Sequence, residues 1–213
     1  MAGNKANKGR KALALVSSGI DSPVAAKMMI DKGLEVIGLH FDNRPFTDAR
    51  PITKTIRICR NIGIKKLYIV KHGLSMGDIV GKINRRLTCL MCRRLMFRIA
   101  ERIAKKEKCS FLITGENLGQ VASQTLDNMV VVTKAVKIPI LRPLLCNDKQ
   151  ETVDMAKSIG TYDVSIEPPG CCRLVPEFPA TKSNIKIVEE EERKFDVENF
   201  INKRLRDAEI IDI

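Results

Sequence analysis

The sequence predicts an α/β fold in which a parallel sheet is covered by helices on both faces. Short apolar segments typical of buried strands alternate with helical segments of about 10–15 residues. Ligands of such sheets bind beyond the carboxyl ends of the strands, where the strand order reverses. We therefore expect the functional residues to follow the strands, which are predicted at 12–16, 35–41, 67–70, 111–114 and 138–145.

Residues that punctuate helices define the expected helical segments. Pro23 opens the first one, which ends at Gly33, and Pro and Gly are usual at these two ends. Amphipathic spacing predicts a helix that stops before Gly63, and a later helix stops at Gly160. The other expected helices are 76–86, 93–106 and a charged C-terminal helix from about 184 to 207.

Length and composition indicate one main domain. We expect a basic N-terminal tail (1–11), a main domain (12–182) and a charged C-terminal helix (183–213). A hydrophobic content of 44% and a charged content of 29% are typical of a soluble globular protein, and no apolar run reaches the roughly 18 residues that span a membrane. The polar N-terminus has no apolar signal core, so we expect a cytoplasmic protein without a membrane.

The chain carries a net charge of +12, which favours a polyanionic partner. Much of the positive charge lies between residues 82 and 108, whereas residues 189–192 are all Glu. A solvated helix face explains part of this basic cluster, but its density beside a cysteine pair favours a nucleic-acid surface. Its members are Lys82, Arg85, Arg86, Arg93, Arg94, Arg98, Arg102, Lys105, Lys106 and Lys108.

A small polar turn, residues 17–22, joins the first strand to the first helix. The unpaired N–H groups of that helix N-terminus and its dipole favour an anion in the turn. The sequence Ser-Ser-Gly-Ile-Asp-Ser is neither a Walker A loop nor Gly-x-Gly-x-x-Gly. An ordinary strand–helix turn is the alternative.

The turn resembles the PP-loop signature Ser-Gly-Gly-x-Asp-Ser of ATP pyrophosphatases, with Ser18 in place of the first Gly. Together with 93–100 and 114–125, it is similar to the tRNA 4-thiouridine sulfurtransferase family, whose bacterial members also serve thiamine synthesis. The resemblance continues in 141–144, 148–149 and 179–182. The resemblance is to the catalytic domain of archaeal-type members of the family. We expect no THUMP or rhodanese domain in this chain.

The resemblance implies an adenine nucleotide alpha hydrolase-like, Rossmann-like fold and a reaction in which ATP activates a uridine carbonyl that sulfur then replaces. Ser17, Ser18, Gly19 and Ser22 would hold pyrophosphate, and Asp21 would bind Mg²⁺ or organise the turn. Lys149 would stabilise the phosphate in the transition state. Other nucleotide contacts would come from Leu15, Val16, His40, Phe41, Arg93, Gly115 and Gln124. His40 could equally be a core histidine, and Arg93 a surface arginine.

Seven cysteines in a reducing compartment indicate metal ligands, redox groups or core residues. Cys89 and Cys92 have the spacing of metal ligands, and Cys171 or Cys172 could add a third thiolate. Zinc would need both adjacent cysteines together, which is strained, whereas three thiolates suit a 4Fe-4S (or 3Fe-4S) cluster. In the competing interpretation, Cys171 resolves a persulfide by forming a disulfide. The remaining cysteines are expected in the core: Cys59, Cys109 and Cys146.

The expected partners are tRNA, either directly or through a separate THUMP-type RNA-binding protein, and a sulfur donor. The donor would be sulfide or the persulfide of a cysteine desulfurase, and a homodimer is possible by resemblance. Two other classes stay open. A PP-loop amidotransferase or ligase would give no reason for Cys89, Cys92 and Cys171, and a non-catalytic nucleotide-binding subunit would show no ATP turnover.

Overall fold

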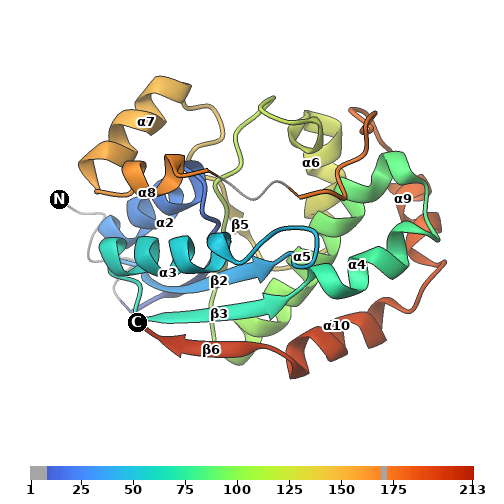
Figure 1. Ribbon diagram of the computed structural model, residues 1–213, viewed down its shortest axis with the longest axis horizontal. Coiled ribbons are helices and arrows are strands. Elements are labelled where there is room, and N and C mark those ends of the chain that lie inside the picture. Colours follow the sequence, from blue (N-terminus) through green and yellow to red (C-terminus); the bar gives the residue numbers. More distant parts are fainter. Residues whose placement is uncertain (1–8, 169–171) are drawn as a thin grey trace.

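A six-stranded sheet lies at the centre of the computed structural model, which describes residues 9–168 and 172–213 (Figure 1). The strand order is β5-β4-β1-β2-β3-β6, and all neighbours are parallel except β3 and β6. The predicted α/β class with a mainly parallel sheet is confirmed. The strands are β1 (Lys11–Leu15), β2 (Glu35–Asp42), β3 (Lys66–Lys71), β4 (Phe111–Ile113), β5 (Ile140–Leu141) and β6 (Glu209–Asp212).

The strand order reverses at β1. The chain runs from β1 to β2 and β3 on one side, and then returns to place β4 on the other side of β1. Ala14 accordingly pairs with Gly38 of β2 and with Ile113 of β4. In open α/β sheets a crevice forms beyond the carboxyl ends at this position, so the residues after β1 lie where a ligand is expected.

One face of the sheet is covered by helices that Figure 1 groups at the left of the view: α2 (Asp21–Asp31), α3 (Arg50–Ile62), α7 (Lys149–Ser158) and α8 (Tyr162–Ile166). Ala12, Ala14 and Val16 point to this face and pack with Val24 and Ala25 of α2. Local signals set the helix ends. Asp148 and Glu151 form a reciprocal capping box on α7: the side chain of Asp148 accepts backbone N–H groups of the first turn, and the side chain of Glu151 accepts the backbone N–H of Asp148.

The opposite face carries α4 (Gly73–Val80), the short η1 (Arg85–Leu87), α5 (Thr88–Lys106) and α6 (Leu126–Thr133), with η2 (Ala122–Gln124) before α6. Leu13, Leu39 and Phe41 alternate onto this face and pack with Phe97 and Ile99 of α5. In the described parts of the chain, no helix is both long enough and apolar enough to cross a membrane.

The C-terminal segment corrects an expectation. Instead of one charged helix, it forms α9 (Ile185–Glu192), α10 (Val197–Arg206) and strand β6. Asp196 begins a new helix because its side chain accepts the N–H of Asn199, which is an N-cap interaction. β6 then pairs antiparallel with the edge strand β3, so this segment is part of the sheet. The predicted strand 138–145 is also shorter than expected, since only Ile140–Leu141 pair.

Candidate functional site

The turn after β1 is organised by hydroxyl groups. The N–H of Ser17 donates to Oγ of Ser22 (2.8 Å), and the two serine Oγ atoms lie 2.9 Å apart. The N–H of Gly19 donates to Oγ of Ser17 (3.3 Å). No side chain of the described residues caps α2, so its first N–H groups remain available for an anion. Ser18 is not in the left-handed region, and therefore serine replaces glycine there without backbone strain.

Two clefts flank this turn, one on each side of β1. The β4-side cleft, of about 230 Å³, is lined by the turn together with Arg93, Glu116 and Gln124. The β2-side cleft, of about 220 Å³, is lined by the turn together with residues 39–43. Leu15, Ser17 and Met96 line both clefts, so a ligand in the turn can extend into each. The structure thus brings together the three predicted stretches that follow β1, β2 and β4.

Glu116 lies at the base of the β4-side cleft and is almost fully buried. Its carboxylate forms an ion pair with Arg93 and accepts hydrogen bonds from Arg142 Nε (2.7 Å) and Thr114 Oγ1 (2.9 Å). Burial by itself raises the pKa of Glu116, but the charges of Arg93 and Arg142 and these hydrogen bonds outweigh it and hold the pKa below its ordinary value. Two guanidinium groups against one carboxylate leave the cleft positive.

Other groups in this cleft have unused hydrogen-bonding capacity. Oε1 of Gln124 and Nε of Arg93 are buried and have no partner within the described residues. Gly115 approaches the turn so closely that a Cβ atom there would lie 2.5 Å from the backbone nitrogen of Ser22. Only glycine therefore fits at this position. Arg93 lies in the second turn of α5, because the helix begins at Thr88 and not at Arg93 as predicted.

His40 faces the β2-side cleft with a defined tautomer. Nδ1 lies 3.0 Å from the carbonyl oxygen of Val16, and since a carbonyl can only accept, Nδ1 carries the hydrogen. Burial lowers the pKa of His40, which keeps the ring neutral. Nε2 is then an acceptor, and it is buried without a partner in the described part of the chain. A ligand in this cleft could supply the missing donor.

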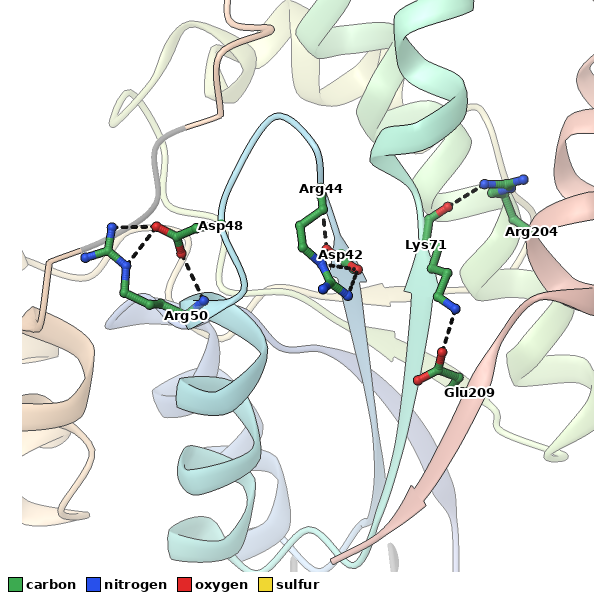
Figure 2. A network of polar contacts seen from close by, with 7 residues as sticks. All are labelled: Asp42, Arg44, Asp48, Arg50, Lys71, Arg204 and Glu209. Carbon is green, nitrogen blue, oxygen red and sulfur yellow. Dashed lines mark hydrogen bonds and ion pairs between the residues drawn. The ribbon is translucent and has the colours of Figure 1, made fainter.

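Asp42 lines the same cleft, and Figure 2 shows it paired with Arg44. Arg44 Nε and Nη2 donate to the buried Asp42 carboxylate at 2.7–3.0 Å. Burial opposes ionisation of Asp42, but the Arg44 hydrogen bonds and charge lower its pKa overall. The same figure shows Asp48 paired with Arg50 at the start of α3, and Lys71 paired with Glu209 between β3 and β6. Arg204 of α10 also donates to the carbonyl of Lys71 (2.7 Å).

Asp21 and Lys149, which were predicted separately as site residues, meet beside the β4-side cleft, which Asp21 lines. Nζ of Lys149 lies 2.9 Å from Oδ1 of Asp21, although the two residues are 128 positions apart. Lys149 is the first residue of α7, so the helix N-terminus and the ammonium group both add positive charge beside the turn. Asp21 partly offsets that charge.

The cysteine pair occupies the first turns of α5, inside the helix and not before it. Sγ of Cys92 lies 3.2 Å from Nε2 of His72 and 3.9 Å from Sδ of Met96, a residue of both clefts. Burial, together with the neighbouring thiols of Cys172 and Cys89, raises the pKa of Cys92 to about 12. Cys172 itself lines the β2-side cleft.

Cys171 lies outside the described residues, and among those described no three His, Cys, Asp or Glu side chains are arranged to hold a metal ion. Of the expected core cysteines, Cys59 and Cys109 are buried, but Cys146 is exposed. That expectation was wrong for Cys146, which lies in the turn that follows β5.

The predicted basic surface also needs correction. Arg94 is fully buried and pairs with Glu192 of α9 (2.8 Å), which Arg98 also contacts (3.0 Å). Arg102 pairs with Glu198 of α10 (2.8 Å). Glu192 of the acidic α9 and Glu198 of α10 therefore pair with the middle of the basic cluster, and the expected surface loses the buried Arg94.

Sequence reasoning missed Glu116, Asp42 and His72. Asp42 ends β2, and Glu116 and His72 come just after β4 and β3, so all three lie at the same edge of the sheet; this position was the signal that could have found them. His72 is fully buried, and burial together with the charge of Arg204 lowers its pKa to about 3.

Comparisons with known proteins agree with this geometry. The sequence profile of the thiamine biosynthesis protein (ThiI) family matches residues 7–197. Proteins described as probable tRNA sulfurtransferases are 42% identical over 209 residues in Caldanaerobacter subterraneus subsp. tengcongensis and 37% identical over 207 residues in Methanosarcina mazei. These alignments cover 95% and 94% of this chain but 54% and 51% of the relatives, so the chain spans about half of their length.

Solved structures show the same fold. A 4-thiouridine synthetase–RNA complex with bound ATP superimposes with a TM-score of 0.91 at 36% identity, covering 96% of this chain and 55% of that one. The NMN synthetase of Francisella tularensis, with a TM-score of 0.59 and 14% identity over 93% of this chain and 78% of that one, shares the fold alone. The chain belongs to the ThiI family, and its α/β domain is of the PP-loop, adenine nucleotide alpha hydrolase-like type.

Proposed function

We propose that this chain is the catalytic part of an ATP-dependent tRNA sulfurtransferase that forms 4-thiouridine. A uridine carbonyl oxygen attacks the α-phosphorus of ATP and pyrophosphate leaves; sulfur then attacks the activated carbon and AMP leaves with the oxygen. The observation that carries the proposal is the turn after β1, which lies where the strand order reverses and is flanked by two clefts. Met96 lines both clefts and contacts Cys92, so the cysteine pair lies close to them.

In this proposal the nucleotide extends across β1. Its base and ribose occupy the β2-side cleft beside Leu15, Val16 and Phe41, and Nε2 of His40 accepts a hydrogen bond from an amino or hydroxyl group. The phosphates lie over the turn and accept hydrogen bonds from Ser17, Ser18, Gly19 and Ser22. Support comes from the buried polar atoms that lack partners on both sides of the turn.

Positive groups would stabilise the charge that develops on the transferring phosphate. Arg93, oriented by Glu116, and Lys149, oriented by Asp21, approach the turn from opposite sides. Mg²⁺ is usually held by one or two carboxylates together with phosphate oxygens, and the carboxylate of Asp21 fits that role. When bound, the ion would neutralise phosphate charge. Gly115 gives the phosphates room, and Gln124 has an open acceptor for the substrate.

For the sulfur, we propose an iron–sulfur cluster (4Fe-4S or 3Fe-4S) held by Cys89, Cys92 and Cys171. Thiolates are the ligands such clusters use, and the raised pKa values of Cys89 and Cys92 mean that both stay protonated unless a cation replaces the proton. When bound, the cluster would supply an iron site for hydrosulfide. The competing proposal is a persulfide, with Cys171 or Cys172 releasing the product as it forms a disulfide. Sulfide or a desulfurase persulfide would be the donor.

The substrate class is proposed from the relatives, since the RNA complex is of a homologous 4-thiouridine synthetase. We propose tRNA as the partner, bound by this chain or with a separate THUMP-type protein, and a homodimer as a possible assembly. Cytoplasmic location remains a prediction of the sequence.

An anaerobic assay tests the function. Protein, ATP, Mg²⁺, sulfide and unmodified tRNA are incubated, and the digested nucleosides are analysed by mass spectrometry for 4-thiouridine. We expect product with the unchanged chain, and none with Asp21→Asn or Cys89→Ser. Cys146→Ser is the matched control, because that thiol is exposed and distant in sequence from the pair. ATP-to-AMP turnover that persists in Cys89→Ser, with no 4-thiouridine formed even by the unchanged chain, would favour an amidotransferase or ligase. Absence of any ATP-to-AMP turnover would favour a non-catalytic subunit.

Iron and acid-labile sulfide analysis separates the two sulfur proposals without an activity measurement. The cluster predicts iron and a visible absorption band that are lost in Cys89→Ser, Cys92→Ser and Cys171→Ser. The persulfide predicts neither iron nor the band, and a Cys171 disulfide after turnover.

A further inference from the structure

The start of the basic cluster keeps its charge, unlike the middle. Lys82, Arg85 and Arg86 are exposed, and none of them has an ion pair within residues 9–168 and 172–213. They lie before α5, whereas Lys105 and Lys106 lie in its last turn. A helix of 19 residues is about 28 Å long, so the two ends of α5 present separate positive surfaces. Only the first adjoins the cysteine pair.

A pocket of about 580 Å³ opens at this charged end of α5. It is lined by Arg85, Arg86, Pro176, Glu177 and Phe178. Phe178 is 69% exposed, and it is the one aromatic residue among the exposed large apolar residues of the described chain. We call this the Phe178 pocket.

Backbone contacts fix both walls of the Phe178 pocket. The N–H of Ala180 donates to the carbonyl of Arg86 (2.9 Å), and the side chain of Asn84 caps η1 by accepting the N–H of Arg86 (3.0 Å). Oγ1 of Thr88 donates to the carbonyl of Arg85 (2.7 Å), which joins η1 to α5. The pocket is therefore built by ordered segments.

Both walls also lead to the sulfur site. η1 continues directly into the turn of α5 that carries Cys89 and Cys92, and the wall with Phe178 follows Cys172 closely in the chain. The two walls of the Phe178 pocket are thus joined through short stretches of chain to Cys89 on one side and, on the other, to Cys172, which lines the β2-side cleft.

We propose that the Phe178 pocket is a base-stacking subsite for single-stranded RNA. An exposed aromatic ring next to guanidinium groups is the combination that binds unstacked bases and their phosphates. Arg85 and Arg86 outweigh Glu177, so the pocket has a net positive charge that complements a polyanion. A base flanking the target uridine would stack on Phe178 while its phosphate contacts Arg85. The proposal rests on the proposed RNA substrate, and it adds the residues of this chain that hold the strand.

Two binding measurements test the subsite. The first is the affinity of the full chain for unmodified tRNA. Phe178→Leu keeps an apolar side chain without an aromatic face, and we expect it to weaken binding by about 5- to 100-fold, while Phe178→Tyr binds like the unchanged chain. Ile210→Ala is the control, because Ile210 is also an exposed large apolar residue but lies on β6. Since Phe178 is exposed, thermal unfolding should not change.

The second measurement reports stacking directly. A short oligouridine that carries one 2-aminopurine should lose fluorescence on binding to the unchanged chain and to Phe178→Tyr, but not to Phe178→Leu. Arg85→Ala should lower the slope of log affinity against log salt by about 0.7, and Lys105→Ala should leave it unchanged.

The outcomes separate this proposal from the proposed function. If Phe178→Leu binds tRNA and quenches 2-aminopurine like the unchanged chain while 4-thiouridine is still formed, the subsite is refuted and the function stands. If the unchanged chain binds neither tRNA nor the oligouridine, the subsite is refuted, and the proposed function then fails only if no 4-thiouridine forms with a THUMP-type partner present. If Phe178→Leu alters only self-association in sedimentation, the pocket takes a second copy of the chain and the RNA subsite is refuted.

Discussion

Replacing Glu116 with Gln tests whether this buried carboxylate holds the β4-side cleft together. The amide has the same shape but no charge, so Arg93 and Arg142 would face each other without the carboxylate between them. Breaking a fully buried pair costs about 3–5 kcal/mol. The side chains of Arg93 and Arg142 keep 24% and 13% of their exposure, which reduces the cost. We therefore expect a loss of about 2–3 kcal/mol in the free energy of unfolding, or about 4–12 °C in Tm for a chain of this size.

Denaturant and thermal unfolding of Glu116→Gln and Glu198→Gln measure this loss. Glu198 pairs with Arg102 at the surface, where both side chains are about half exposed, and its replacement should cost less than about 1 kcal/mol. The pH dependence supplies a second check. Since the pKa of Glu116 is lowered in the folded state, its stabilisation is present above the ordinary value of 4.5 and is lost as pH falls through the lowered pKa. The difference between the unchanged chain and Glu116→Gln should shrink there. Equal losses in both variants at neutral pH would refute the reasoning.

Three further results are expected. Gly115→Ala should abolish ATP binding in calorimetry, because its Cβ would lie 2.5 Å from the backbone of the turn. Gly81→Ala, where the atom nearest to the added Cβ is 4.0 Å away, should bind ATP normally. Equal binding by the two variants would contradict the close approach at Gly115. Lys149→Ala should reduce AMP release by more than tenfold without changing Tm, since the one polar contact of its exposed ammonium within the described residues is with Asp21. A loss of Tm instead would indicate a structural role. Iodoacetamide at pH 8 should alkylate the exposed Cys146 in the metal-free protein well before Cys92 or Cys59, because burial raises the pKa of each of these two thiols to about 12. Mass spectrometry follows the labelling, and early labelling of Cys92 would show that its thiol is accessible.

The features that the sequence predicts well are those with local causes. Pro23 and Gly33 enclose α2, and Asp148 begins α7, because helix ends depend on a few neighbouring residues. Features that need a distant partner were missed. β6 exists because β3 offers an unpaired edge, and four residues at the C-terminus do not by themselves indicate a strand. The stretches expected to bind the nucleotide could be placed together from topology alone, since the carboxyl ends of parallel strands lie at one edge of the sheet.

The partner and burial of a charged side chain are the features that the sequence predicts least well, because cations that are close in the sequence can have different environments in the fold. Arg94 and Glu192 are 98 positions apart and pair in the core, and Arg93, one residue earlier, turns instead to Glu116 in the β4-side cleft. Helical periodicity separates these two neighbours by about 100°, so one faces α9 and the other faces the turn. The positive surface that remains for RNA depends on which arginines find a carboxylate. Glu192 of α9 and Glu198 of α10 pair with arginines in the middle of α5. Arg85 and Arg86, which have no ion pair within the described residues, lie just before its N-terminal end with Phe178 in the same pocket.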